Sequence, residues 1–328
     1  MTGGTRDGRI SKRDRAGFFS SAKTFFLPAG EQFEAGTVRG YYIDLRVKAE
    51  TPQRPPITSS LHVAGIQLGL GCFERYLAGE GEAWLQAARE YAEDLVVHQQ
   101  LEGPQAGGFL HQEPLGHTFR LRPPWISAMA QGEAASLLVR IFQETGDQRL
   151  ADSALLALQP LRVDIGAGGV SALLNGGPFL QEYPTQPPSF VLNGGIFAIW
   201  GLYDVGVALD SESARAAFEH CLDTLVANLH CWDVGYWSRY DLFPHPTTNV
   251  ASSFYHDLHI NQLRAMHRLA PRPELAQTAE RWAEYAASPA CRRRAVAHKA
   301  LFRVLVPRNP LLAHKLPRRR AESQAQPS

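Results

Sequence analysis

Apolar residues recur at intervals of three and four over most of the chain, the spacing of residues on one face of an α-helix. Seven segments between positions 63 and 286 show this pattern, and each predicts a helix with one buried stripe. The segments are Val63–Leu77, Trp84–Leu95, Ile126–Ile141, Ile196–Val207, Phe218–Leu229, Ile260–Leu269 and Leu275–Ala286. Asp210 and Ser211 are candidate N-caps for one of them.

The intervening segments predict β structure in small amounts. Tyr41–Val47 alternates apolar and polar residues after Gly40, which is typical of a strand. Asp164–Tyr183 and Val234–Asp241 are rich in Gly and aromatic residues and predict hairpin or strand insertions. The predicted helices come in antiparallel pairs joined to the next pair by longer loops, so we expect a mainly α fold, an incomplete α/α toroid. A superhelical repeat protein is the alternative, but no fixed short period is visible.

Charge is uneven along the chain. The 328 residues carry a net charge of +1, which gives no overall indication of nucleic acid as a partner. Ten Lys or Arg residues and one acid, Glu322, fall between Cys291 and Ser328. We therefore divide the chain into an N-terminal arm at 1–36, a toroid domain at 37–290 and a basic tail at 291–328.

The tail contains a predicted basic amphipathic helix from Arg292 to Leu305, ended by Pro307. Such a helix can lie on an anionic membrane surface. It can also hold an anionic polysaccharide near the mouth of the toroid, or pack its few apolar residues on the last helix pair. A homodimer stays open as a further partner.

Compartment and cofactors follow from short patterns. No signal-peptide core and no apolar stretch of spanning length is present, so we expect a cytoplasmic protein, either free or at the inner face of the membrane. The four cysteines form no C-x-x-C pair, and no zinc pattern or Gly-rich phosphate loop occurs. We expect neither a metal nor a nucleotide cofactor.

Polar chemistry gathers at three predicted loop-to-helix junctions, within residues 181–195, 233–242 and 254–263, and more weakly within 125–134. Each places Tyr, His, Asn or Glu where the side chains can project into the mouth of a helical barrel. Aromatic rings beside hydrogen-bonding groups suit sugars. Taken singly, each segment is equally typical of helix capping and packing.

Taken together, these blocks resemble the C-terminal domain of the glucuronyl C5-epimerases. The likeness extends from about Tyr41 to Ala287 and is strong from Trp125 onward. The blocks that resemble the family's, in the same order, are Ser127–Gly132, Glu182–Thr185, Ser189–Gly194, Gly201–Asp204, Tyr240–Leu242, Tyr255–Leu263 and Arg281–Trp282.

The resemblance implies an isomerase that inverts carbon 5 of D-glucuronate, to L-iduronate, in a uronate polysaccharide such as heparosan or heparan sulfate. The reaction removes the proton α to a carboxylate and returns one from the opposite face. Tyr183, Tyr240 and Tyr255, with Glu182, are implied as the acid/base set. We assign Tyr183 with Glu182 to one face and Tyr255 or Tyr240 to the other.

Further residues are implied as sugar-binding groups: Asn193, His256, His259, Asn261, Trp125 and Gln131. For His259 and Asn261, hydrogen bonding at a helix start is the alternative. Phe243 stands where the family commonly has an Arg, which puts carboxylate binding in question. Arg239 is the candidate replacement, although a solvated loop charge explains it as well, and Arg120 and Arg122 are alternative anchors.

Two rival functions remain. A polysaccharide lyase abstracts the same proton and then expels the group at carbon 4, giving an ultraviolet-absorbing unsaturated product. A non-catalytic glycan-binding domain would retain the fold and lose the chemistry. Phe243 favours this second rival, and the presence of all three tyrosines opposes it.

Overall fold

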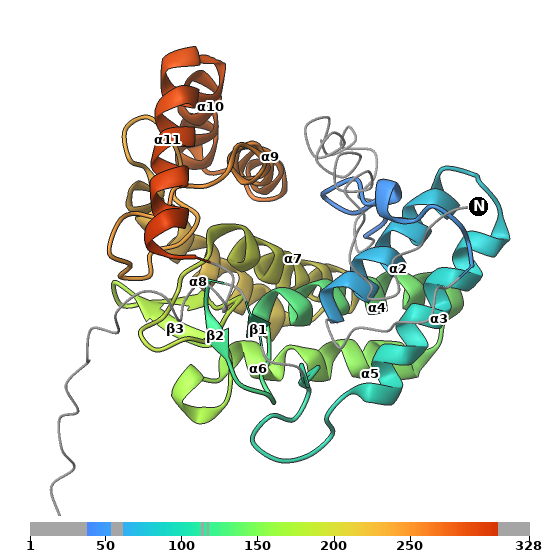
Figure 1. Cartoon of the computed structure of the whole chain (residues 1–328). Coiled ribbons are helices and arrows are strands. Elements are labelled where there is room, and N and C mark those ends of the chain that lie inside the picture. Colours follow the sequence, from blue (N-terminus) through green and yellow to red (C-terminus); the bar gives the residue numbers. More distant parts are fainter. Residues whose placement is uncertain (1–37, 54–61, 113–114, 117, 308–328) are drawn as a thin grey trace, which may run out of the picture.

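The computed structural model describes residues 38–53, 62–112, 115–116 and 118–307, and helices dominate this part of the chain (Figure 1). Most of the helices form antiparallel hairpins. The hairpins are α2 (His62–Leu77) with α3 (Glu82–His98), α4 (Ala128–Thr145) with α5 (Gln148–Ala157), α7 (Leu192–Ala208) with α8 (Glu212–Asn228), and α9 (Ser253–Leu269) with α10 (Pro273–Ala287). The seven helices predicted between residues 63 and 286 are confirmed, and α5 is an additional helix among them.

The first helix of each hairpin belongs to an inner row in the order α2, α4, α7, α9. The contact between α4 and α7 is the closest, because glycines lie where the two backbones meet. A Cβ at Gly132 would lie 2.5 Å from the Cα of Ala198, and one at Gly201 would lie 2.4 Å from the Cα of Gly132. Helix α7 is buried on nearly every side, whereas the outer helices expose one face. This arrangement confirms the predicted incomplete α/α toroid.

Two short hairpins supplement the helices. Strands β3 (Ser171–Leu174) and β4 (Gly177–Leu180) pair antiparallel across a turn at Asn175 and Gly176, both with positive φ. They confirm the predicted insertion at 164–183, which also contains the short η3 (Ile165–Ala167) and follows α6 (Gln159–Arg162). Strands β1 (Leu115–Gly116) and β2 (Arg120–Leu121) form the second hairpin. The segment 234–241 forms only isolated bridges after η4 (Leu229–Trp232).

The predicted strand at Tyr41–Val47 is wrong. This segment contains bends and the single 3₁₀ turn η2 (Arg46–Lys48), and Tyr41, Tyr42, Ile43 and Leu45 are all buried. A strand requires a partner strand for its backbone groups. In this segment a helix side chain takes that role, because Glu74 Oε2 of α2 accepts from Leu45 N–H at 2.6 Å. Directly upstream, Arg140 of α4 donates to the carbonyls of Arg39 and Gly40 at 2.9 and 3.0 Å.

Arg140 itself forms a fully buried ion pair with Asp204 of α7, with an N–O distance of 2.6 Å. The hydroxyl of Tyr42 donates to the same carboxylate. The N-terminal segment is therefore fixed to the α4–α7 contact at the centre of the fold.

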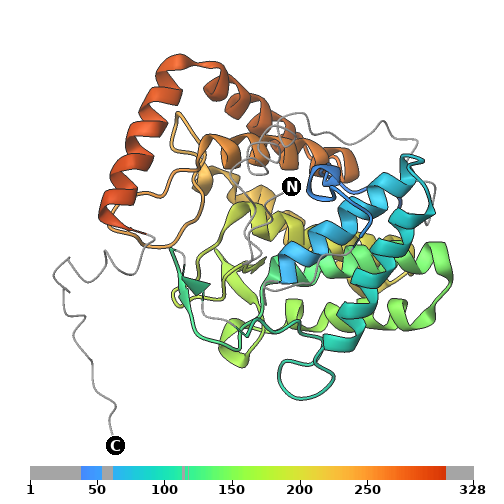
Figure 2. The same cartoon turned by 45° about the vertical axis from the view of Figure 1, so that its right-hand side comes forward.

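Helix α11 (Pro289–Leu305) follows α10 and corresponds to the predicted basic amphipathic helix (Figures 1 and 2). It buries Ala295 and Phe302, while Val296, Leu301, Val304 and Leu305 are exposed. The predicted arm at 1–36 and the tail from 308 onward lie outside the described residues. Among the described helices, none combines the length and the apolar character that crossing a bilayer requires.

Candidate active site

A cavity of about 280 Å³ lies inside the inner row of helices. Its volume is near the lower end of the range for small-molecule sites, roughly 300–1,000 Å³. Five of the predicted site residues line it together: Trp125, Glu182, Tyr183, Asn193 and Tyr255. Because these residues come from three separate loop-to-helix junctions, the fold brings the separate sequence blocks to one place.

Glu182 follows β4 and lies against the first turn of α7. A Cβ at Gly194 would stand 2.3 Å from Glu182 Oε2 and 2.4 Å from its Cβ, so only glycine leaves room for this carboxylate. The side chain is 7% exposed. Burial raises the pKa of Glu182 to about 7, and hydrogen bonding with Tyr183 opposes the rise. Near neutral pH this carboxyl group can therefore both accept and release a proton.

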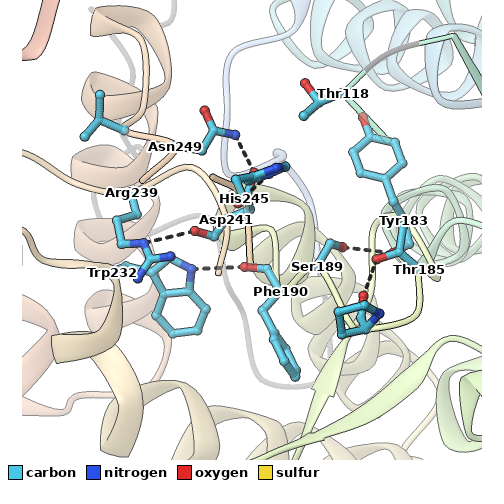
Figure 3. A network of polar contacts seen from close by, with 12 residues as sticks. Thr118, Tyr183, Thr185, Ser189, Phe190, Trp232, Arg239, Asp241, His245 and Asn249 are labelled. Atoms are coloured by element: carbon cyan, nitrogen blue, oxygen red, sulfur yellow. Dashed lines mark hydrogen bonds and ion pairs between the residues drawn. The ribbon is translucent and has the colours of Figure 1, made fainter. Parts of the chain in front are cut away.

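Tyr183 is positioned by its own loop (Figure 3). Its carbonyl accepts a hydrogen bond from Ser189 Oγ at 2.9 Å, and Thr185 Oγ1 donates to the carbonyl of Pro187 at 2.8 Å. Burial, and next the charge of Glu182, raises the pKa of Tyr183 well above its ordinary value. In this state the phenol is protonated, which makes it a proton donor unless Glu182 accepts its hydrogen.

Tyr240 lies behind the cavity wall and not in its lining. Its ring meets the ring of Tyr255 edge-on, with centroids 4.9 Å apart. Tyr240 N–H donates to the carbonyl of Asn249 at 2.8 Å, and its carbonyl accepts from Leu192 N–H at 3.2 Å. Burial raises the pKa of Tyr240 well above its ordinary value. Tyr183 and Tyr255 both pack on the cluster that contains Tyr240, so this residue links the two.

The cavity contains buried polar atoms without a hydrogen-bond partner among the described residues. These atoms are Glu182 Oε2, Asn193 Oδ1 and both ring nitrogens of His111. Leaving such atoms unpaired costs free energy, roughly 1–3 kcal/mol each. Their concentration in one cavity indicates a site built for a polar ligand.

Sequence reasoning missed His111. Its backbone pairs with that of Trp125, with N–O distances of 2.8 and 3.3 Å, and its ring stacks on the Trp125 indole at 4.0 Å. Burial lowers the pKa of His111 to about 3, so its ring is neutral. A lone His in a loop gave no signal, because the pairing with Trp125 exists only in the fold.

A second missed group connects the N-terminal segment to the cavity. Lys48 and Gln67 line it, and Gln67 Nε2 donates to Glu133 Oε1 at 2.7 Å. Lys48 Nζ donates to Gln67 Oε1. Burial lowers the pKa of Lys48 and raises that of Glu133, and the attraction between the two opposes both shifts. Lys48 followed a wrongly predicted strand, so nothing in the sequence placed it here.

Several predicted binding residues lie outside the cavity lining. Gln131 Oε1 accepts from Phe109 N–H at 2.7 Å, and its Nε2 donates to the carbonyls of Gly107 and Ala157, both at 2.9 Å. All its polar atoms are thereby used within the protein. Arg239 Nε donates to the carbonyl of Asp241 at 3.2 Å (Figure 3). Asn261 is buried elsewhere on α9, and Arg120 and Arg122 are exposed.

His256 and His259 form a buried cluster beneath the segment that bears Tyr240. Both Nδ1 atoms contact Ser238 Oγ, at 2.8 and 2.9 Å, and His256 Nε2 contacts the carbonyl of Trp282 at 3.0 Å. Burial lowers the pKa of both rings, that of His256 to about 4, so they are neutral. These contacts use both ring nitrogens of His256, whereas His259 Nε2 is buried without a hydrogen-bond partner among the described residues. Neither histidine lines the cavity. Among the described residues, no cluster of three or more His, Cys, Asp or Glu could hold a metal ion.

Comparison with known proteins adds the family context. The sequence profile described as D-glucuronyl C5-epimerase C-terminus matches residues 109–284. A D-glucuronyl C5-epimerase of Caenorhabditis elegans is 34% identical over 182 residues, which are 51% of this chain and 29% of the worm protein. An uncharacterized protein of Methanocaldococcus jannaschii is 28% identical over 131 residues, 39% of this chain and 42% of its own length. The chain thus spans less than half of either relative.

The solved structure of a glycoside hydrolase from family 105 of C. acetobutylicum is also similar, with a TM-score of 0.50 and 15% identity. The match covers 84% of this chain and 71% of that chain. At this level of identity the similarity concerns the fold alone.

Proposed function

Because the chain belongs to the D-glucuronyl C5-epimerase C-terminus family, we propose that it inverts carbon 5 of D-glucuronate residues, to L-iduronate, in a uronate polysaccharide. One observation carries the proposal: Glu182, Tyr183 and Tyr255 meet in a single cavity that also contains unpaired buried polar atoms. An acid/base pair near carbon 5 is what the reaction requires.

The hydrogen on carbon 5 is weakly acidic, because the adjacent carboxylate already carries a negative charge. Removing it creates an enediolate-like state that the site must stabilise by charge and hydrogen bonds. Inversion then needs a second proton, delivered from the opposite face. The site must therefore provide a base on one side of the sugar and an acid on the other.

Glu182 and Tyr183 fit the first role as a unit. The Tyr183 oxygen takes the proton from carbon 5 while its own hydroxyl proton passes to the Glu182 carboxylate. The pKa of Glu182, raised to about 7 by burial, makes this transfer less unfavourable than transfer to an ordinary carboxylate. Tyr183 can thus act as a base although its hydroxyl is protonated before the substrate binds.

Tyr255 fits the second role, as the donor to the opposite face, with the ring of Tyr240 packed edge-on against it. Asn193, whose Oδ1 has no partner among the described residues, can accept a hydrogen bond from a sugar hydroxyl. Trp125 offers an aromatic face to the ring.

Incubation with a heparosan-like polymer in heavy water tests the proposal. We expect deuterium at carbon 5 and the appearance of iduronate by NMR. Exchange together with an ultraviolet-absorbing product would support the lyase instead. Binding of the polymer without any exchange would support the non-catalytic glycan-binding domain.

We further propose that α11 places the protein on an anionic membrane surface, at the cytoplasmic face. Its outward side combines exposed Val296, Leu301, Val304 and Leu305 with exposed Arg292, Arg293 and Arg294. A helix with this composition binds by burying apolar side chains and by attraction to anionic lipid.

Surface substitutions test this better than truncation, because α11 also contacts the Tyr240 loop through Lys299. We expect Leu301→Ser with Val304→Ser to abolish pelleting with anionic vesicles at low salt while turnover of a soluble oligosaccharide persists. Unchanged pelleting would contradict the proposal. A shift from dimer to monomer without vesicle binding would identify the face as a homodimer contact.

A further inference from the structure

The cavity has a second wall that the family profile does not cover. The profile begins at residue 109, whereas Ile43, Leu45, Lys48 and the α2 residues Val63, Ala64 and Gln67 line the cavity from the N-terminal side. These residues line the same cavity as Glu182, Tyr183 and Tyr255. The contribution of these residues to the cavity therefore comes from outside the part of the chain that the family profile matches.

A uronate substrate needs a cation in the site, and the family blocks do not supply one here. Phe243 packs its ring against those of Phe119 and His245, with centroids 5.5 and 4.8 Å apart, and carries no charge. Arg239 is directed to the backbone of Asp241, outside the lining. The neutral His111 ring does not provide the charge either.

Lys48 supplies what the other wall lacks. It is the only Lys or Arg that lines the cavity within the part of the chain that the structure describes. Its ammonium group shares the cavity with Tyr183, Tyr255 and the unpaired oxygens of Glu182 and Asn193. A carboxylate bound at Lys48 would therefore belong to the same sugar that meets the acid/base groups.

The backbone that carries Lys48 is firmly held. Leu45 N–H donates to Glu74 Oε2 at 2.6 Å, and the Lys48 N–H donates to the Leu45 carbonyl at 2.9 Å. The Leu45 carbonyl lies so close to α2 that a Cβ at Gly71 would stand 2.4 Å from it. With the Arg140 contacts upstream, these interactions pre-position the side chain, which reduces the entropy lost on binding.

Charge around Lys48 favours an incoming anion. Its nearest acidic neighbour in the network is Glu133, reached through Gln67. Burial raises the pKa of Glu133 to about 8, although the hydrogen bond from Gln67 and the charge of Lys48 oppose the rise. The protonated form of Glu133 places less negative charge near Lys48, and a substrate carboxylate can approach the ammonium group.

We propose that Lys48 binds the carboxylate of the uronate whose carbon 5 is inverted. In this chain it would take the role of the Arg that the family commonly has in place of Phe243. The inference rests on the proposed epimerase function. Bound there, the ammonium would neutralise the carboxylate and stabilise the enediolate-like state that follows proton removal. Lys48 would therefore act on both substrate binding and turnover.

Calorimetry with two matched probes tests this directly: a glucuronate-containing heparosan oligosaccharide, and the same oligosaccharide with its carboxyl groups reduced to alcohols. We expect the wild-type protein to prefer the first probe by roughly 10- to 100-fold, the range for hydrogen bonds to charged groups. Lys48→Gln should bind both equally, and Lys48→Arg should retain a preference. Deuterium exchange at carbon 5 is measured in parallel.

The outcomes separate this inference from the epimerase proposal. Exchange in the wild type, with the carboxylate preference intact in Lys48→Gln, would overturn the role of Lys48 alone. A preference that depends on Lys48, without any exchange, would overturn the epimerase and leave Lys48 as a uronate-binding residue. If Lys48→Gln unfolds because the hydrogen-bond chain from Lys48 through Gln67 to Glu133 is disturbed, Lys48→Gln with Glu133→Gln removes both ionisable groups and is expected to lose the preference too.

Discussion

The carboxylate of Glu182 occupies space that exists only because residue 194 has no side chain. An added Cβ at Gly194 would lie 2.3 Å from Glu182 Oε2, 2.4 Å from its Cβ and 2.7 Å from its Cδ. All three distances are too short for real contacts, and the Glu182 Cβ cannot move without moving the loop. The glycine at the start of α7 therefore fixes where the proposed base lies.

Gly194→Ala is expected to reduce turnover at least tenfold, because it displaces Glu182 from Tyr183. Overpacking of this kind usually costs about 1–3 kcal/mol in stability. Gly195→Ala is the matched control: its Cβ would meet the Phe179 ring at 2.5 Å, away from Glu182. Gly195→Ala should lose stability, which melting curves measure. Its turnover, divided by the folded fraction that those curves give, should stay unchanged. Equal turnover in both variants would contradict the role of Gly194.

The pH dependence of the reaction should follow Glu182. Because its pKa is raised to about 7, the carboxylate needed to accept a proton disappears as the pH falls below that value. We expect kcat/KM to decline on the acid side with a midpoint near 7, and Glu182→Gln to remove most activity together with this limb. A wild-type profile flat from pH 5 to 8 would argue against Glu182 as the base.

The raised pKa of Glu182 also predicts that the stability of the fold decreases as the pH rises, whereas the activity increases. A carboxyl group whose pKa is higher in the folded than in the unfolded protein stabilises the fold at low pH, and this contribution is lost as the pH rises. The loss should run from the ordinary pKa of 4.5 through about 7. Denaturant unfolding should show this decline in the wild type, and a weaker one in Glu182→Gln.

Tyr183→Phe and Tyr255→Phe should each reduce inversion about a hundredfold or more, within the usual contribution of acid/base catalysis. Each change keeps the ring and removes the hydroxyl, so melting temperatures should stay nearly constant, as in the control Tyr203→Phe. Tyr255→Phe keeps Tyr183 and Glu182, the proposed base for the carbon 5 hydrogen of glucuronate. This variant should therefore still exchange deuterium into glucuronate without forming iduronate. Near-normal inversion in either variant would exclude that hydroxyl from the reaction.

Lys299 connects α11 to the site. Its Nζ donates to Asn249 Oδ1 and to the Val250 carbonyl, both at 2.7 Å, and the Asn249 carbonyl in turn accepts from Tyr240 N–H at 2.8 Å. Lys299→Met should lower turnover about tenfold by loosening this loop, within the range for lost charged hydrogen bonds. The exposed Arg293→Met on the same helix is the control. Equal turnover in both would mean that α11 does not support the site.

Arg140→Met tests the centre of the fold. It would leave Asp204 buried without its cation and release the carbonyls of Arg39 and Gly40. Breaking a buried pair in this way typically costs about 3–5 kcal/mol. Arg149→Met, which removes an exposed ion pair with Glu93, should change the denaturation midpoint little. A small loss in Arg140→Met would show that the N-terminal segment is held by its apolar side chains alone.

The helices were predictable because their periodicity is local information. In α10, Leu275, Ala279 and Trp282 are spaced four and three residues apart, as on one face of a helix, and all three are buried in the structure. The N-cap at Ser211 was likewise visible, and its side chain accepts from Ala214 N–H. The resemblance of the ordered motif blocks to the epimerase family implied that Glu182, Tyr183, Asn193 and Tyr255 belong to one site, and all four line the cavity.

Other residues were misjudged because only distant partners decide what they do. Gln131 and His256 looked like binding groups, yet their polar atoms are used by backbone groups far away in the sequence. Tyr41–Val47 has the alternation of a strand, but the hydrogen bond from Leu45 N–H to Glu74 and the packing of Tyr41 on Trp200 of α7 take the place of a partner strand. The sequence pattern could not predict these contacts, since they depend on which surfaces meet in the folded protein.

By itself, the sequence determined a mainly helical chain and its helix hairpins, because helical periodicity is encoded locally, and its resemblance to the epimerase family implied the proposed acid/base residues. Only the tertiary structure decided that Lys48, Gln67 and His111 line the same cavity as Glu182, Tyr183 and Tyr255. It also decided that α11 supports Tyr240 through Lys299. The physical reason is that burial and long-range contacts set which side chains reach the cavity and in which protonation state.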